Sequence, residues 1–213
     1  MTRSCINTLW AVGCIAVTPA HAAAPVAVDA AWLAANHVPA TKGVVASRRM
    51  VDAAGEHVLV LSRLTGPSPS SPNSGRIEHI ELKADYYARA GTGWQREWAV
   101  RDFVDCPGLD SAAAFDADAI AFTDLNGDGR AEVTIAYRLF CGGGIESQTV
   151  KVILRDGATK LAIRGESVVR LPGQAPFGGE HRYDAALLQP ERRAFKGHLE
   201  RIWQSVADRG KQR

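Results

Sequence analysis

The chain has 213 residues, of which 46% are hydrophobic and 23% charged, and its formal net charge is +2 at pH 7. A chain of this length can bury a sizeable core and fits one domain or two small ones. Its nearly balanced charge gives no indication of a nucleic-acid or anionic-membrane partner.

The first 22 residues have the three parts of a secretory signal peptide in the right order. Arg3 supplies a positive charge, an apolar run follows at residues 9–17, and Ala-His-Ala at residues 20–22 is a small-x-small cleavage site. The apolar run is much shorter than the ~20 residues that a bilayer span needs, so we expect cleavage rather than a permanent anchor. The alternatives are a buried N-terminal helix or a lipoprotein modified at Cys14, but little apolar chain precedes that cysteine. We therefore expect a periplasmic or secreted protein.

Cleavage would leave two of the four cysteines, Cys106 and Cys141. An oxidising compartment favours a disulfide between them, and the alternative is two unpaired thiols in the core. The bridge would close a loop of about 36 residues, which the chain-entropy model equates with about 4 kcal/mol of stabilisation. The mature chain would carry 24 basic and 23 acidic residues, because only Arg3 is lost from the charged set.

The N-terminal half of the mature chain is predicted to be mostly strands. Residues 23–42 form a lead-in with a short helix at Asp29–Asn36, and a single mostly-β domain covers residues 43–208, followed by a tail at 209–213. Strands at 43–51 and 56–64 flank an Asp-Ala-Ala-Gly turn. The run Val-Leu-Val-Leu within the second strand is apolar on both faces, which predicts a strand in the middle of a sheet.

The next segments continue this pattern. Residues 65–75 contain three prolines and four serines, which predicts a long hairpin loop rather than a domain boundary. Apolar and polar residues then alternate strictly over 79–90, so one face of that strand should be buried. A returning strand carries Trp94 to Val104. Further strands are predicted at 119–123, 132–141, 149–155 and 159–164, the last two joined by an Asp-Gly turn.

The C-terminus is predicted to be one amphipathic helix over residues 190–208. Pro190 suits its first turn. One apolar stripe should dock on the sheet, although a membrane-surface or partner helix has the same pattern; the stripe consists of Phe195, Leu199, Ile202, Trp203 and Val206. The order of elements predicts an α+β fold, mostly antiparallel β, arranged as a meander sheet or sandwich with one C-terminal helix.

One short segment has the residue pattern of a metal site. Oxygen-bearing side chains recur at alternate positions in Asp-Leu-Asn-Gly-Asp-Gly, residues 124–129, and two glycines let the backbone turn sharply. Calcium takes six to eight oxygen ligands, which this spacing would bring around one point. The segment begins like an EF-hand loop, but its twelfth position is Ile135 and its flanks are predicted strands. The alternative is a metal-free turn, because Asn-Gly and Asp-Gly favour turns by themselves.

The segment from Asp124 to Val133 resembles the calcium loop of FG-GAP and integrin-type repeats. The resemblance implies calcium ligands at the first, third, fifth, seventh and ninth positions, which here are Asp124, Asn126, Asp128, the carbonyl of Arg130, and Glu132. Glu132 replaces the usual Asp, so that contact could be longer or mediated by water. The motif occurs once over about fifteen residues, so the propeller fold of the family is not expected.

A fainter resemblance covers residues 123–137, Cys141 and residues 161–165. Together they are similar to a family of small exported bacterial proteins that are loosely described as surface-polysaccharide biosynthesis proteins. This resemblance implies a location in the cell envelope and no particular reaction.

Other polar and aromatic residues suggest weaker hypotheses. Trp94 and Trp98 are expected on one strand face, where they could stack on a sugar ring or pack in the core. The histidines lack metal-ligand spacing, and His79 and His198 are expected at the surface. Asp116 and Asp118, with Glu166, are the only carboxylates that we can name for an acid pair.

The sequence therefore favours an exported, non-enzymatic binding or scaffold domain with one structural calcium ion. Its partner would be an envelope polysaccharide or an envelope protein. The alternative is a periplasmic enzyme or accessory protein acting on envelope polysaccharide, which would need two carboxylates about 5–10 Å apart in a cleft. An inhibitor of a foreign enzyme is a third hypothesis, but no residue supports it.

Overall fold

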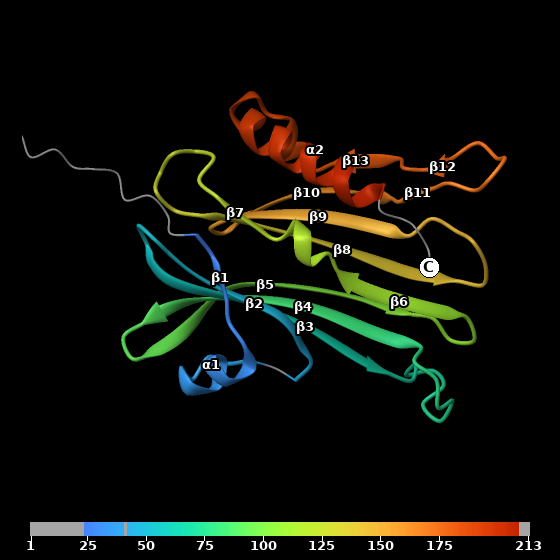
Figure 1. Cartoon of the computed structure of the whole chain (residues 1–213), viewed down its shortest axis with the longest axis horizontal. Helices are drawn as coiled ribbons and strands as arrows, with labels where there is room; N and C mark the ends of the chain where they lie inside the picture. Colours follow the sequence, from blue (N-terminus) through green and yellow to red (C-terminus); the bar gives the residue numbers. More distant parts are fainter. Residues whose placement is uncertain (1–23, 41, 209–213) are drawn as a thin grey trace, which may run out of the picture.

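A computed structural model describes residues 24–40 and 42–208, so the predicted signal peptide and tail lie outside the described residues. The structure is mostly antiparallel β, as predicted (Figure 1). Its strands are β1 (Val26–Ala27), β2 (Val44–Asp52), β3 (Gly55–Gly66), β4 (His79–Ala90), β5 (Gly93–Asp105), β6 (Asp110–Phe115), β7 (Ala121–Thr123), β8 (Glu132–Gly142), β9 (Thr149–Asp156), β10 (Thr159–Glu166), β11 (Val168–Val169), β12 (Phe177–Gly178) and β13 (His181–Tyr183). Its α-helices are α1 (Ala30–Ala35) and α2 (Arg193–Ala207).

The strands form two main antiparallel sheets. Sheet A has the order β1-β2-β3-β4-β5, and sheet B has the order β13-β10-β9-β8-β6, with β7 also paired to β8. Strands β3 and β4 pair across the serine- and proline-rich segment, which confirms the predicted hairpin loop. Strands β11 and β12 form a separate two-stranded ribbon.

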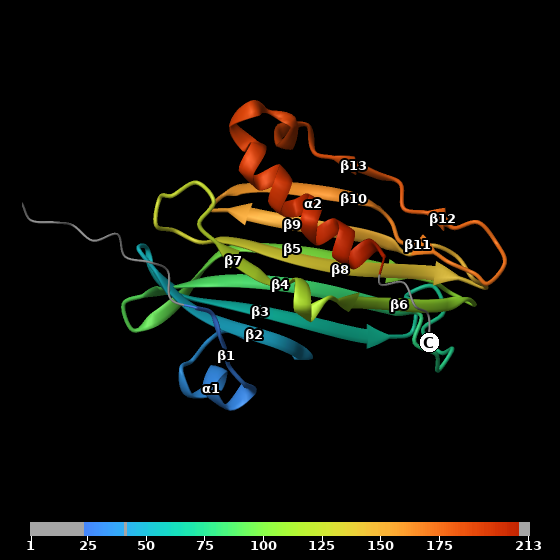
Figure 2. The same cartoon turned by 45° about the horizontal axis from the view of Figure 1, so that its top comes forward.

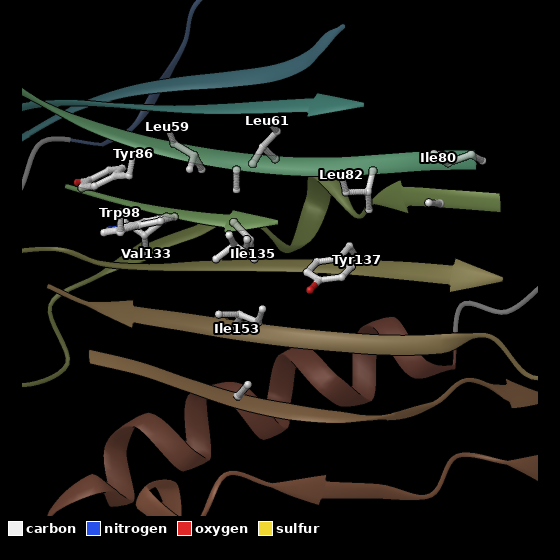
Figure 3. Packing of buried hydrophobic residues seen from close by; sticks show 14 of the residues in the cluster. Leu59, Leu61, Ile80, Leu82, Tyr86, Trp98, Val133, Ile135, Tyr137 and Ile153 are labelled. Carbon is white, nitrogen blue, oxygen red and sulfur yellow. The ribbon is translucent and has the colours of Figure 1, made fainter. Parts of the chain in front are cut away.

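The inner faces of the two sheets pack against each other to form the largest core cluster (Figure 3). Leu59 and Leu61 of β3 are fully buried there, together with Ile135 of β8. Neighbouring residues of β3, Val58 and Val60, point the other way and pack on α1. Strand β3 is therefore apolar on both faces because both faces are covered, as the sequence predicted for a central strand.

Each sheet also carries a helix on its outer face (Figure 2). Helix α2 lies across β9 and β10, and its apolar stripe is buried there with Phe195, Leu199 and Trp203 almost completely enclosed. The stripe is thus core, as predicted. Helix α1 begins after Asp29, whose side chain accepts a hydrogen bond from Trp32 N at 2.8 Å. Among the described residues, no helix is both long and apolar enough to cross a membrane.

Several short strands were not predicted. Strand β1 pairs with β2, so part of the expected lead-in belongs to sheet A. Strand β6, with the sequence Asp-Ser-Ala-Ala-Ala-Phe, pairs with β8 along its whole length. Alanine has a low strand propensity, so this strand depends on its long-range pairing rather than on its own sequence.

The predicted cysteine pair is present at bonding distance. Cys106, directly after β5, and Cys141, near the end of β8, are joined with an S–S distance of 2.09 Å and a Cα–Cα distance of 5.5 Å. The bridge therefore links the end of β5, at the edge of sheet A, to β8, which lies next to the edge strand β6 of sheet B.

Candidate metal centre

Residues 124–131 connect β7 to β8 at one end of the two sheets, on the left in Figure 1. The pairing of Thr123 with Glu132 brings the two ends of this loop together. Gly127 and Gly129 have φ angles of 75° and 79°, in the left-handed region that favours glycine. The loop thus turns where the sequence predicted.

The alternate oxygen side chains of the loop bind its own backbone. Asp124 Oδ2 accepts a hydrogen bond from Gly129 N at 3.0 Å, and Asn126 Oδ1 accepts one from Asp128 N at 3.0 Å. Asp128 Oδ1 accepts from Arg130 N at 2.8 Å, and its other oxygen accepts from the amide of Asn126 at 3.1 Å. These hydrogen bonds tie the side chains of Asp124, Asn126 and Asp128 to the loop itself.

Glu132, the ninth residue of the segment, binds the beginning of the loop through its side chain. Its side chain is almost fully buried, with the residue 1% exposed. Oε2 accepts hydrogen bonds from Leu125 N at 2.8 Å and from the Thr123 hydroxyl at 3.1 Å. Oε1 is buried with no hydrogen-bond partner among the described residues. Burial raises the pKa of Glu132 in spite of the hydrogen bonds that oppose this effect.

The donor set fits calcium in its chemistry, but the carboxylates are not gathered around one point. In the part of the chain that the structure describes, no group of three or more His, Cys, Asp or Glu side chains is placed to hold a metal ion. Asp124 and Asp128 are directed instead to backbone N–H groups. Calcium accepts amide and carbonyl oxygens as well as carboxylates, so Asn126 and the Arg130 carbonyl belong to the available donors. Glu132 Oε1, which has no hydrogen-bond partner among the described residues, is a further available oxygen.

The opposite sheet also contacts this loop, which the sequence did not reveal. The turn between β2 and β3 reaches across from sheet A, where Asp52 Oδ2 accepts a hydrogen bond from Ala131 N at 2.9 Å. Ala53 N donates to the carbonyl of Gly129 at 2.9 Å. The sequence predicted this segment only as a turn, because the partner of Asp52, Ala131, lies 79 residues further along the chain.

A small polar cavity of about 60 Å³ lies beside this contact, between the two sheets. His57 lines it and is 2% exposed, with Nε2 3.3 Å from Asp52 Oδ1 and Nδ1 3.8 Å from Glu97 Oε2. Arg130 and Arg155 also line it. At roughly 10–15 Å³ per water position, the cavity has room for about four to six waters, and it is far smaller than a typical ligand pocket of roughly 300–1,000 Å³. It cannot enclose a sugar ring.

The prediction that Trp94 and Trp98 share a strand face is wrong. Tyr86 pairs with Trp98 whereas Tyr87 pairs with Arg96, so Glu97 is an extra residue that forms a β-bulge. The bulge reverses the alternation. Trp98 therefore packs in the inner core, stacked on Tyr86 at 5.0 Å, while Trp94 packs on α1 at the outer face. The two indoles do not form one stacking platform.

The positions of two histidines and of the named acids can also be compared with the expectations from the sequence. His198, expected at the surface, is 8% exposed, and its Nε2 lies 3.0 Å from the Thr134 hydroxyl because α2 presses this face onto sheet B. His79 is half-buried and stacks on Phe103. The acids named for an acid pair have separate surroundings: Asp116 lies 3.9 Å from Arg138, whereas Glu166 accepts a hydrogen bond from Ser147 at 2.8 Å.

Comparison with protein-family models, with curated proteins and with solved structures finds no match for this chain.

Proposed function

We propose that the protein is an exported domain of the cell envelope in which one calcium ion, bound by the loop between β7 and β8, stabilises two packed sheets. It would act as a binding or scaffold module, with an envelope polysaccharide or envelope protein as its partner. Three features support this proposal: the signal-peptide pattern of residues 1–22, the bridged cysteines Cys106 and Cys141, and the oxygen-rich loop. The polar cavity of about 60 Å³ beside the loop is too small to hold a sugar ring, so we assign no substrate to it.

The observation that carries the proposal is the unpartnered carboxylate oxygen of Glu132. A buried carboxylate is strongly disfavoured unless donors or a cation compensate it. Oε2 of Glu132 has donors among the described residues, whereas the buried Oε1 has no hydrogen-bond partner there. A calcium ion would supply the missing positive charge. Its ligands would be Asp124, Asn126, Asp128, the Arg130 carbonyl and Glu132, and when bound it would neutralise the repulsion among three carboxylates.

Thermal unfolding of the mature domain tests this function. Extracellular calcium modules commonly have dissociation constants of about 10⁻⁴–10⁻³ M. About 10 mM calcium should then raise the melting temperature by about 3–10 °C, because ligand binding stabilises the folded state by mass action. Asp128→Ala should remove most of this shift. The matched control, Asp110→Ala, removes an exposed aspartate at the other end of the molecule and should retain it. Absence of any shift in the unmodified domain would overturn the proposal.

A further inference from the structure

The turn between β2 and β3 contacts the loop at two successive peptide groups. The N–H of Ala131 donates to Asp52 Oδ2, and this N–H belongs to the same peptide unit as the carbonyl of Arg130. A peptide unit is planar and trans, so its C=O and N–H point in opposite directions. Asp52 therefore fixes the direction of the Arg130 carbonyl, which must point away from the turn.

The second contact acts on the neighbouring carbonyl. Ala53 N donates to Gly129 O, so that oxygen is directed toward sheet A and away from the ligand set of the loop. The left-handed φ of Gly129 allows this reversal, and a Cβ at this position would approach the Ala53 side chain to 3.1 Å. Because of these two hydrogen bonds, the carbonyl of Gly129 points toward sheet A and the carbonyl of Arg130 points away from it.

Asp52 is itself held rigidly before it meets the loop. Its side chain is 3% exposed, and Oδ1 accepts a hydrogen bond from Ala54 N at 2.7 Å. The same oxygen lies 3.3 Å from His57 Nε2, and the His57 ring stacks on Tyr86 at 5.2 Å with an interplanar angle of 3°. A carboxylate fixed in this way can orient a partner without first losing much side-chain freedom of its own.

The geometry points to Asp52 of sheet A as a positioning residue for the calcium loop of sheet B, so that calcium binding fastens the two sheets together. This inference rests on the proposed calcium function. Asp52 does not touch the ion. It orients the Arg130 peptide group and, as an anionic acceptor, increases the negative charge on the carbonyl oxygen that binds the ion. Residues that orient metal ligands in this way typically change metal affinity by about 10–100-fold when they are replaced.

Calorimetric titration of the mature domain with calcium chloride tests the role of Asp52. In Asp52→Asn, one acceptor oxygen becomes an NH₂ group, so Ala54 N and Ala131 N can no longer both be satisfied. We expect its calcium dissociation constant to rise about tenfold or more. The matched control is Glu56→Gln, which removes a negative charge from the same hairpin at a residue paired with Arg49 rather than with the loop. This control should bind calcium like the unmodified domain.

A second variant reaches the same contact independently. Ala53→Pro removes the N–H that donates to Gly129 O, and proline is favoured at the second position of such a turn. It too should weaken calcium binding. Melting temperatures measured without calcium separate this role from a merely structural one: a structural role would lower them in the variants and leave the dissociation constant unchanged.

The outcomes distinguish the two proposals. If the unmodified domain releases or absorbs no heat, both the calcium function and the role of Asp52 fail. If it binds calcium, and Asp52→Asn and Ala53→Pro bind equally well, the function stands and the role of Asp52 is wrong. Equal weakening by Asp52→Asn and Glu56→Gln would also overturn the role, because it would indicate a general charge effect. Selective weakening by the two turn variants supports it.

Discussion

The two ends of β8 are fastened to sheet A in different ways. At its end, Cys141 is bonded covalently to Cys106, whereas at its beginning the loop before Glu132 meets sheet A through hydrogen bonds to the turn of Asp52. Each end also contains one buried glutamate. Glu78 lies beside the disulfide, where its carbonyl accepts a hydrogen bond from Cys106 N, and it is 2% exposed; Glu132 is 1% exposed.

The two glutamates differ in how their charge is compensated. Glu78 Oε2 accepts from the Ser71 hydroxyl at 2.6 Å and Oε1 from Gly108 N at 2.9 Å, and these hydrogen bonds, that of Ser71 first, lower its pKa to about 2. Glu132 has donors on one oxygen only, and burial raises its pKa. For Glu78 the hydrogen bonds outweigh the cost of burial, whereas for Glu132 the cost of burial outweighs the hydrogen bonds, so the two pKa values move in opposite directions. The hydrogen bonds at the disulfide end thus compensate Glu78, whereas at the loop end the proposed calcium ion would compensate Glu132.

The largest effect is expected from breaking the covalent end. Replacing both Cys106 and Cys141 with alanine should lower the free energy of unfolding by about 4 kcal/mol, because the unfolded chain regains the entropy of an open loop. Denaturant unfolding would measure it, and reductant should affect the unmodified domain in the same way. The stabilisation by calcium should survive, since nine steps of about 3.3 Å along β8 separate the two ends by roughly 30 Å. Loss of that stabilisation would mean that the two ends do not act independently.

The next effect concerns the loop end. Glu132→Gln keeps an oxygen that can accept from Leu125 N but removes the buried charge. Without calcium the variant should be at least as stable as the unmodified domain, because no carboxylate has to be desolvated. About 10 mM calcium should stabilise the unmodified domain by about 1.4–2.7 kcal/mol and the variant much less. Denaturant unfolding with and without calcium would measure both. Glu166→Gln, an exposed glutamate bonded to Ser147, is the control; a full calcium response of Glu132→Gln would contradict the interpretation.

The sequence predicted those elements whose signal is local. The alternation of residues 79–90 predicted β4, and the apolar stripe near the C-terminus predicted α2. Each of these periodicities can be recognised within one continuous segment of the sequence. The loop was found for the same reason, since all its oxygen side chains lie within nine residues. Asp52 could not be found, because it meets the loop only through the packing of the two sheets.

The prediction that the two tryptophans share a strand face was wrong because of the bulge at Glu97. An extra residue in one strand reverses which side chains face the core, and a count in steps of two cannot detect it. His57 was passed over although it alternates with Leu59 and Leu61 on the inner face of β3. The even spacing of His57 from these two core residues was the signal that could have placed it on the buried inner face.

The smallest effect is expected at the disulfide end and only in acid. Because the pKa of Glu78 is lowered from 4.5 to about 2 on folding, its ionised form stabilises the folded state above pH 4.5. This contribution should be lost progressively as the pH falls from 4.5 toward 2. Ser71→Ala removes the donor with the largest influence, so the pKa of Glu78 should rise and the stability gained between pH 2 and 4.5 should shrink.

Melting temperatures of the unmodified domain and Ser71→Ala between pH 2 and 7 would measure this difference. The matched control is Ser70→Ala in the same loop, whose hydroxyl lies 2.7 Å from that of Ser68 instead of Glu78. Its acid profile should follow the unmodified domain. If Ser71→Ala and the unmodified domain had parallel profiles, hydrogen bonding would not be what compensates Glu78, and the contrast with Glu132 would lose its physical basis.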